Sequence, residues 1–288
     1  MVEDTKIDAL EKRKIDEIKH SDKRRSIVKG YEYNSDANIK DTIGQFISGS
    51  EDYAKHFSNM KFYSISRSSF TYRDTLLFES IKDAIALDYC CGNGEIAIEM
   101  AKKGASRVVG IDLSSIAIEN ATNLAKKAGI QHICEFHVMD AENTSFADNT
   151  FDIIHEYGAL HHLELNSAFS ELCRILKPEG KLICTEAMRH NPLIHWYRKK
   201  TPHLRTKWEV EHILGVPELK NGKQYFRNIN LKMFHLAALA AVPFRKSSFF
   251  DTFLPFLEQL DEILLSLPYV KLLAWIAIVE YRNPRKYL

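Results

Sequence analysis

The sequence lacks a long apolar run, an excess of charge of one sign and any cysteine set at metal-ligand spacing. Its longest apolar stretches, around 236–242 and 272–279, are far too short to span a bilayer, and its charged beginning is not a secretory signal. The 39 Lys and Arg residues balance 38 Asp and Glu residues, which argues against a nucleic-acid-binding surface. Five cysteines, an odd number on apparent core elements, suit a reducing compartment. We therefore expect a cytoplasmic protein with no stable membrane insertion, metal or nucleic-acid partner.

The most informative stretch is 84–112, which predicts a strand, a tight turn, a helix and a second strand. Gly92 and Gly94 interrupt the first apolar run, helical spacing follows, and the β-branched run 107–111 ends at Asp112. Glycines let the backbone approach a ligand closely at a helix N-terminus. A carboxylate at the tip of the next strand can accept hydrogen bonds from both ribose hydroxyls. The stretch therefore predicts an adenosine site.

Two classes of ligand use such a site, dinucleotides and S-adenosylmethionine. Residues 92–97, GNGEIA, also fit the G-x-G-x-x-A dinucleotide fingerprint. Asp88, at the end of the first strand, would repel a pyrophosphate but suits the ammonium of a methionine moiety and a nearby sulfonium. A glycine turn in an α/β protein without a cofactor is the plainer alternative.

Residues 87–94, LDYCCGNG, resemble the first motif of class I S-adenosylmethionine-dependent methyltransferases, which runs acid-x-Gly-x-Gly-x-Gly. Cys90 replaces the first glycine of that motif. We expect the loop to be intact, because a small side chain is tolerated where the backbone dihedrals are ordinary.

Later motifs extend the resemblance over about residues 85–187. Ser114 is a plausible N-cap of a helix that continues to Lys127, and the strand 132–138 leads into Asp140, where the family has an acid that meets the adenine amine. A loop aspartate that caps a turn is the alternative for Asp140. The resemblance implies S-adenosylmethionine as cofactor, with contacts from Asp88, Cys90, Gly92, Gly94, Asp112, Leu113, Asp140, Ala141, Glu142 and Glu156.

The resemblance is strongest at 151–163, FDIIHEYGALHHL, a frequent signature in small-molecule methyltransferases related to those of quinone biosynthesis. The segment 176–182, LKPEGKL, is another recurrent element of the family. Adjacent histidines on a helix point in different directions, so His161 and His162 alone are an implausible metal site, and we expect no metal.

These elements predict an α/β fold: a Rossmann-like sheet of seven mostly parallel strands, with helices on both faces and the last strand antiparallel. We expect strand five at 181–186, a helix at 254–265 and the last strand at 272–281. The methyltransferase domain would span 81–288, with a substrate-specific insertion at about 189–241, and 1–80 would form a helical N-terminal lid.

The N-terminal segment has two interpretations. Residues 1–25 are highly charged with a thin apolar stripe, which fits either a solvated surface helix or a lid or partner-contacting helix, and an exchanged segment could build a homo-oligomer. Residues 31–78 are rich in aromatics. We expect the N-terminal segment and the insertion to select the acceptor over one cofactor face, although ordinary packing is as probable for any single aromatic. The expected substrate pocket consists of Tyr63, Tyr72, Tyr157, His195 and Arg205, with Arg198, Glu209 and His212 as further polar residues.

The predicted reaction is S-adenosylmethionine-dependent methyl transfer to a carbon, oxygen or nitrogen of a small, largely apolar molecule, in secondary-metabolite or quinone-like biosynthesis. Such a displacement mainly needs alignment in a dry pocket. His161, His162 or His212 could serve as a base if the acceptor must lose a proton. A protein or nucleic-acid methyltransferase would share the core, but EYGA at 156–159 stands where such enzymes have an N-P-P-Y-type tetrapeptide. An NAD(P)-dependent oxidoreductase and a non-catalytic scaffold are further alternatives.

Overall fold

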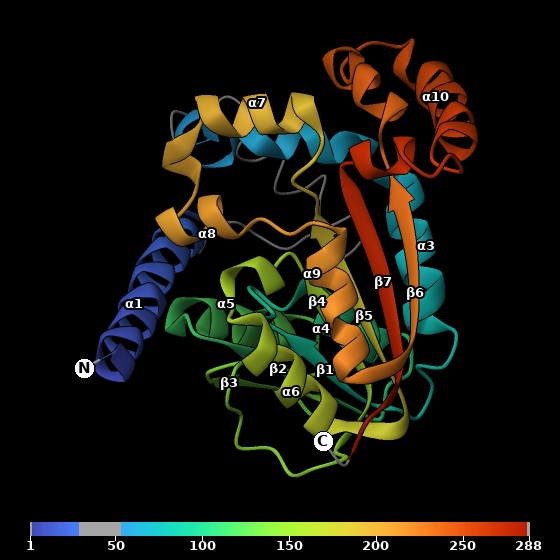
Figure 1. Ribbon diagram of the computed structural model, residues 1–288. Helices are drawn as coiled ribbons and strands as arrows, with labels where there is room; N and C mark the ends of the chain where they lie inside the picture. The colour runs from blue at the N-terminus through green and yellow to red at the C-terminus, as the bar shows by residue number, and fades with distance from the viewer. Residues whose placement is uncertain (1, 29–52, 287–288) are drawn as a thin grey trace.

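The computed structural model describes residues 2–28 and 53–286, and it contains a seven-stranded sheet in the order β3-β2-β1-β4-β5-β7-β6 (Figure 1). The first five strands along the chain pair in parallel, and β7 is antiparallel to both β5 and β6. The predicted fold is therefore confirmed. The strands are β1 (Ile85–Tyr89), β2 (Arg107–Asp112), β3 (Cys134–Val138), β4 (Phe151–Tyr157), β5 (Leu176–Ala187), β6 (Phe226–Phe234) and β7 (Ile276–Pro284).

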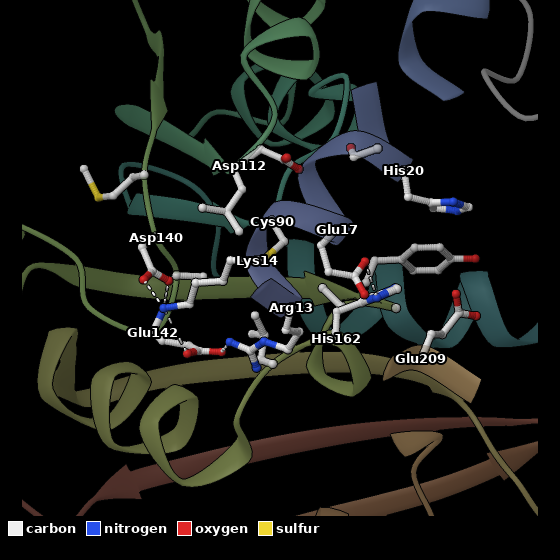
Figure 2. A pocket seen from close by; sticks show the side chains of 18 of the residues that line it. Arg13, Lys14, Glu17, His20, Cys90, Asp112, Asp140, Glu142, His162 and Glu209 are labelled. Carbon is white, nitrogen blue, oxygen red and sulfur yellow. Dashed lines mark hydrogen bonds and ion pairs between the residues drawn. The ribbon is translucent and has the colours of Figure 1, made fainter. Parts of the chain in front are cut away.

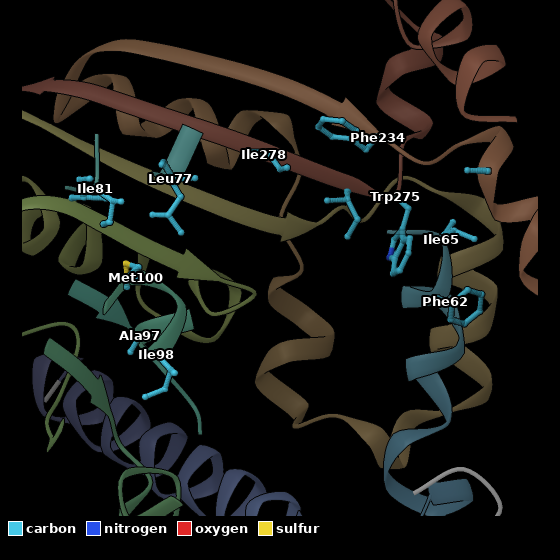
Figure 3. Close-up of a cluster of buried hydrophobic side chains, with 14 of the residues drawn as sticks. Phe62, Ile65, Leu77, Ile81, Ala97, Ile98, Met100, Phe234, Trp275 and Ile278 are labelled. Carbon is cyan, nitrogen blue, oxygen red and sulfur yellow. The ribbon is translucent and has the colours of Figure 1, made fainter. Parts of the chain in front are cut away.

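The sheet separates two hydrophobic clusters, because successive residues of a strand point to opposite faces. Ala86 belongs to the first cluster and its neighbour Leu87 to the second. The first cluster packs under α3 (Arg67–Phe78), α4 (Glu95–Lys102) and α5 (Ser115–Lys127), and Figure 3 shows Leu77, Ala97 and Ile98 within it. The second packs under α6 (Leu165–Ile175). The two layers hold β1 and β4 rigidly, with their carboxyl ends at one edge of the sheet.

Capping side chains mark the starts of α5 and α6. Ser114 Oγ accepts a hydrogen bond from the amide of Ala117 at 3.0 Å, which confirms the predicted N-cap of α5. Glu164 accepts from the amide of Ser167 at 2.8 Å at the start of α6.

The predicted insertion at 189–241 is too long, because the chain returns to the sheet at Phe226. Only α7 (Pro192–Lys200), α8 (Lys207–His212), α9 (Val216–Asn221) and short 3-10 turns separate β5 from β6. β6 lies at the sheet edge, so polar residues such as Asn228 and Lys232 are exposed and its sequence does not resemble a buried strand. A second excursion, with α10 (Phe250–Leu264), joins β6 to β7. β5 and β7 begin at Leu176 and Ile276 rather than at the predicted residues.

The N-terminal helix α1 (Val2–Val28) lies beside α5 and reaches the end of α8 (Figure 1). Its contacts are mainly polar: Asn120 Nδ2 donates to the carbonyl of Arg25 at 3.3 Å, and the Arg13 guanidinium lies 4.9 Å from the centroid of the Trp208 ring. Ile15 is 48 % exposed, so this residue of the predicted apolar stripe does not dock. The side chains of Ile7 and Leu10, and the aromatic residues from Tyr31 to Phe46, lie outside the described residues.

Within the part of the chain that the structure describes, no helix combines the length and the apolar character that crossing a membrane requires.

Candidate active site

The loop after β1 is tied to the tip of β2. Asp112 Oδ2 accepts a hydrogen bond from the amide of Gly92 at 3.0 Å, and its Oδ1 accepts from the amide of Ser114 at 2.8 Å. The predicted turn is therefore present, but Cys90 does not have ordinary dihedrals: its φ is +59°, in the left-handed region. That conformation costs a residue with a Cβ about 1–2 kcal/mol. The family glycine that Cys90 replaces would avoid this strain.

The two glycines of the loop have different surroundings. A Cβ on Gly92 would lie 2.6 Å from Nη2 of Arg25, so α1 passes directly over the loop. A Cβ on Gly94 would lie 2.8 Å from Cβ of Ala121 and 2.9 Å from the Phe136 ring. Gly94 lines neither of the cavities described below, so its placement corrects the predicted cofactor contact to a packing role between α4 and α5.

The first cavity, of about 210 Å³, opens at the carboxyl ends of β1, β2 and β3. Asp112, Leu113, Asp140, Ala141 and Glu142, the residues expected to contact the cofactor, line it together with Cys90. This arrangement follows from the fold, because parallel strands bring their carboxyl ends to one edge.

Basic residues of α1 pair with the acids of the first cavity (Figure 2). Lys14 Nζ lies 2.6 Å from Asp140 Oδ2, and Arg13 Nη2 lies 2.5 Å from Glu142 Oε1. Burial alone would lower the pKa of Lys14, but the hydrogen bond to Asp140 and the charges of both acids raise it. The helix therefore covers the cavity, and its Lys14 pairs with Asp140, the acid expected to meet adenine.

Two predicted cofactor contacts are buried structural carboxylates. Asp88 is 3 % exposed, accepts from the amide of Ala97 at 3.1 Å and lies 3.0 Å from His155 Nδ1. Burial raises its pKa to about 8, against the effect of the Ala97 hydrogen bond. Asp88 lines the second cavity rather than the first. Glu156 is fully buried, accepts from the amide of Ala159 at 2.5 Å and lines neither cavity, which corrects its predicted role.

The second cavity, of about 390 Å³, adjoins the first. The two share Cys90, Tyr157, Gly158, His162 and Glu209 as lining residues, together with Arg24 and Arg25 of α1. Four aromatic residues form one wall: Phe62, Tyr63, Tyr197 and Trp275. Their rings meet edge to face, with 4.8 Å between the centroids of Phe62 and Tyr197 and 5.2 Å between those of Tyr63 and Trp275.

Part of the predicted substrate pocket is brought together at this second cavity. Tyr63, Tyr157 and Arg205 line it. Tyr72 does not, because it packs beside Phe234 with 5.5 Å between the ring centroids, under the sheet edge. His195 is exposed on α7 and also lines neither cavity. These two placements correct the prediction, since residue type alone does not tell which face of a helix carries a side chain.

The three candidate histidines have different surroundings. His161 Nδ1 lies 2.7 Å from Oε2 of Glu186, which is buried on β5, while its Nε2 lies 3.9 Å from Glu209 Oε1. Burial alone would raise the pKa of Glu186, but the charge and hydrogen bond of His161 lower it. His162 Nδ1 lies 3.0 Å from Oε2 of Glu17. His212 is exposed, stacks on Trp208 at 3.6 Å and lines neither cavity, which corrects its selection as a base.

One cluster has metal-ligand residue types: single ligand atoms of His161, His162 and Glu209 all lie within 4.8 Å of one another. Other groups already engage them. Glu186 binds His161 Nδ1, and Nε of Arg205 lies 3.2 Å from Glu209 Oε1.

Several site residues were not selected from the sequence. Arg13, Lys14 and Arg24 lie in a charged segment where nothing distinguishes a cavity-facing residue from a solvated one. Glu186 lies at the end of an apolar strand, as Asp112 and Glu156 do. That position at the strand end is the sequence feature that could have identified it as a site residue.

Residues 81–232 match a family model described as a methyltransferase domain. The ubiquinone/menaquinone biosynthesis C-methyltransferase of Rickettsia massiliae is 38 % identical over 106 residues, which cover 35 % of this chain and 43 % of the relative. A sterol 24-C-methyltransferase of Aspergillus fumigatus is 30 % identical over 162 residues, which cover 54 % of this chain and 42 % of the relative. The chain thus spans less than half the length of these relatives.

Solved structures give the same fold. A geranyl diphosphate C-methyltransferase from Streptomyces coelicolor A3(2) is 14 % identical, with a TM-score of 0.51 over 82 % of this chain and 85 % of that one. An N-methyltransferase from Bradyrhizobium japonicum WM9 is also 14 % identical, with a TM-score of 0.51 over 86 % of this chain and 100 % of that one. At such low identity the likeness concerns the fold alone. Since the family model matches more than half of the residues, the chain belongs to the methyltransferase domain family.

Proposed function

We propose that this protein transfers the methyl group of S-adenosylmethionine to a small molecule, with the cofactor in the first cavity and the acceptor in the second. The observation that carries this proposal is the border between the two cavities, formed by Cys90, Tyr157, Gly158 and His162. A methyl carbon held at that border faces both cavities, and alignment of donor and acceptor is the main requirement of the displacement.

The residues of the first cavity suit the cofactor. Asp112 and Asp140 offer carboxylates for ribose hydroxyls and an exocyclic amine. Gly92 lines the second cavity rather than the first. Arg25, whose guanidinium lies over Gly92, offers a cation for a methionine carboxylate. Lys14 must release Asp140 before adenine can bind there. Once bound, S-adenosylmethionine supplies an electrophilic methyl group on a sulfonium.

The second cavity positions the acceptor and can take up its proton. The aromatic wall excludes water and offers flat apolar surface. His161 is the candidate base: Glu186 fixes its Nδ1, which leaves Nε2 as the atom that accepts a proton from the acceptor. The buried carboxylate then stabilises the resulting imidazolium, as in other carboxylate–histidine pairs.

The acceptor atom is proposed from the relatives. The quinone-biosynthesis and sterol enzymes named above are C-methyltransferases. We therefore place this chain with enzymes that methylate carbon of a small molecule in a biosynthetic pathway. A carbon acceptor must lose a proton after or during transfer, which is consistent with a base at the cavity.

The proposal is tested by binding and by turnover. Calorimetry should detect S-adenosylhomocysteine binding, and mass spectrometry of small-molecule extracts incubated with methyl-labelled S-adenosylmethionine should find a labelled product. His161→Gln should lower the turnover number about 10²- to 10⁴-fold without changing cofactor affinity. His137→Gln is the matched control, because that exposed histidine on β3 lines neither cavity. Unchanged turnover in His161→Gln would refute the assignment of His161 as the base. If no extract gives a labelled product, methyl transfer to small molecules is contradicted.

The cytoplasmic location and a homo-oligomer built through the N-terminal segment stay predictions. Size-exclusion mass of the full chain, compared with a chain that lacks residues 1–25, tests the second of them.

A further inference from the structure

Five arginines line the second cavity, and we call the three that lie around Glu209 the arginine cluster. Arg24 comes from α1, while Arg198 and Arg205 come from the segment after β5. Nη1 of Arg198 donates to the carbonyl of Met188 at 2.9 Å, and Nη1 of Arg205 donates to the carbonyl of Thr201 at 3.1 Å. These backbone contacts orient two guanidinium groups but do not neutralise their charge.

The arginine cluster carries more charge than nearby carboxylates balance. Glu209 pairs with Arg205, but no carboxylate of the described side chains lies within ion-pair distance of Arg24 or Arg198. Burial and a neighbouring arginine lower the pKa of Arg24 and of Arg198 to about 10, which leaves both charged at neutral pH. Half-buried charges that no carboxylate balances are unfavourable, so such a cluster is suited to a bound anion.

The same charges argue against a metal ion at the neighbouring His161, His162 and Glu209. Glu209 already pairs with Arg205, and His161 Nδ1 pairs with Glu186. A cation at this point would be repelled by the guanidinium groups that line the same cavity.

The opposite character of the two walls defines what fits the second cavity. The aromatic wall accepts an apolar body, and the arginine cluster accepts an anionic head. Within the arginine cluster three guanidiniums face one carboxylate, Glu209, which favours a dianionic group over a single carboxylate. The other charged residues of the lining are Arg25 and Arg73, with the carboxylates Asp88 and Glu95. The planar guanidinium fork also matches pairs of phosphoryl oxygens.

We propose that the acceptor is an apolar molecule with a phosphate or diphosphate head, which the arginine cluster binds. This inference rests on the proposed function, because it takes the second cavity as the acceptor site. It also changes the expected substrate, from a largely apolar molecule to an amphiphilic one.

The experiment is a calorimetric titration of the full chain, saturated with S-adenosylhomocysteine, with inorganic pyrophosphate. Arg198→Gln and Arg205→Gln should each weaken pyrophosphate binding about tenfold or more, since each removes a charge-assisted hydrogen bond. Arg198→Lys keeps the charge but lacks the planar guanidinium group. Its affinity for pyrophosphate should lie between those of the parent and of Arg198→Gln. Arg189→Gln is the matched control: it lies in the same segment, pairs with Glu218 at 2.9 Å and lines neither cavity. Retained affinity for S-adenosylhomocysteine confirms that each variant is folded.

Several outcomes would overturn the proposal. Pyrophosphate could fail to bind to folded, S-adenosylhomocysteine-loaded protein, or bind equally to all variants and the control. Tighter binding of succinate than of pyrophosphate would assign the cluster to a carboxylate, and tight binding of Mg²⁺ alone would assign the site to a cation. If S-adenosylhomocysteine does not bind, the proposed function fails instead, and pyrophosphate titration of the free protein still decides on the arginine cluster.

Discussion

Replacing Asp112 with asparagine tests the adenosine site directly. The carboxylate uses one oxygen for the amide of Gly92 and the other for the amide of Ser114, and it also lines the first cavity. Asparagine has one acceptor oxygen, so it can keep only one of these bonds and directs an N–H group at the other amide. It also removes the charge that accepts hydrogen bonds from ribose hydroxyls in the proposed complex.

The expected loss follows from the bond type. A hydrogen bond to a charged group contributes about 1.5–3 kcal/mol, which corresponds to a dissociation constant about ten to a hundred times higher. Calorimetry with S-adenosylhomocysteine measures this change, and urea unfolding measures how much the lost backbone bond destabilises the fold.

Asp152 offers a matched control at the other end of β1. Its Oδ2 accepts from the amide of Ile85 at 3.0 Å and lies 2.8 Å from Nζ of Lys177, and it lines neither cavity. Asp152→Asn should therefore destabilise the chain modestly with the same cofactor affinity. A folded Asp112→Asn protein with the affinity of the parent would refute the assignment of Asp112 to the ribose.

Three further predictions concern stability and the N-terminal helix. Burial lowers the pKa of His235 from 6.5 to about 3, so this histidine stays neutral in the folded chain. The stability is therefore complete above pH 6.5 and is lost as the pH falls, by about 2 kcal/mol at pH 5. Unfolding of His235→Asn should depend less on acid pH. Cys90→Gly should raise the free energy of unfolding by up to about 1 kcal/mol through relief of its left-handed conformation, and a clear fall would contradict this. Deletion of residues 1–23, which spares Arg24 and Arg25, should lower turnover much more than cofactor affinity, and full turnover would disprove the lid.

The sheet and the position of Asp112 and Asp140 at its edge were predictable because each depends on local sequence pattern. β2 is a buried apolar run that ends in Asp112, and Asp140 follows the end of β3 by two residues, so parallel pairing brings both acids to one edge of the sheet. Glu156 fits the same pattern but turns inward to cap the next loop, which the pattern does not distinguish.

The features that local sequence pattern did not predict depend on contacts between residues far apart in the chain. β6 alternates polar and apolar residues because it is an edge strand, and only its pairing with β7 identifies it. The pairing of Lys14 with Asp140 joins residues 126 positions apart, and the arginine cluster combines α1 with the segment after β5. Neither segment alone indicates a cavity.

Helix α1 borders both cavities, and under the proposed function this couples the binding of cofactor and acceptor. Lys14 lies on an acid of the first cavity, and Arg24, on the same helix, lines both. A cofactor that displaces Lys14 would therefore act on the helix that carries part of the proposed acceptor site. The two binding equilibria are then linked, and the factor by which cofactor changes acceptor affinity equals the factor by which acceptor changes cofactor affinity. Product departure is subject to the same linkage, so loss of the methylated product changes how tightly the spent cofactor is held.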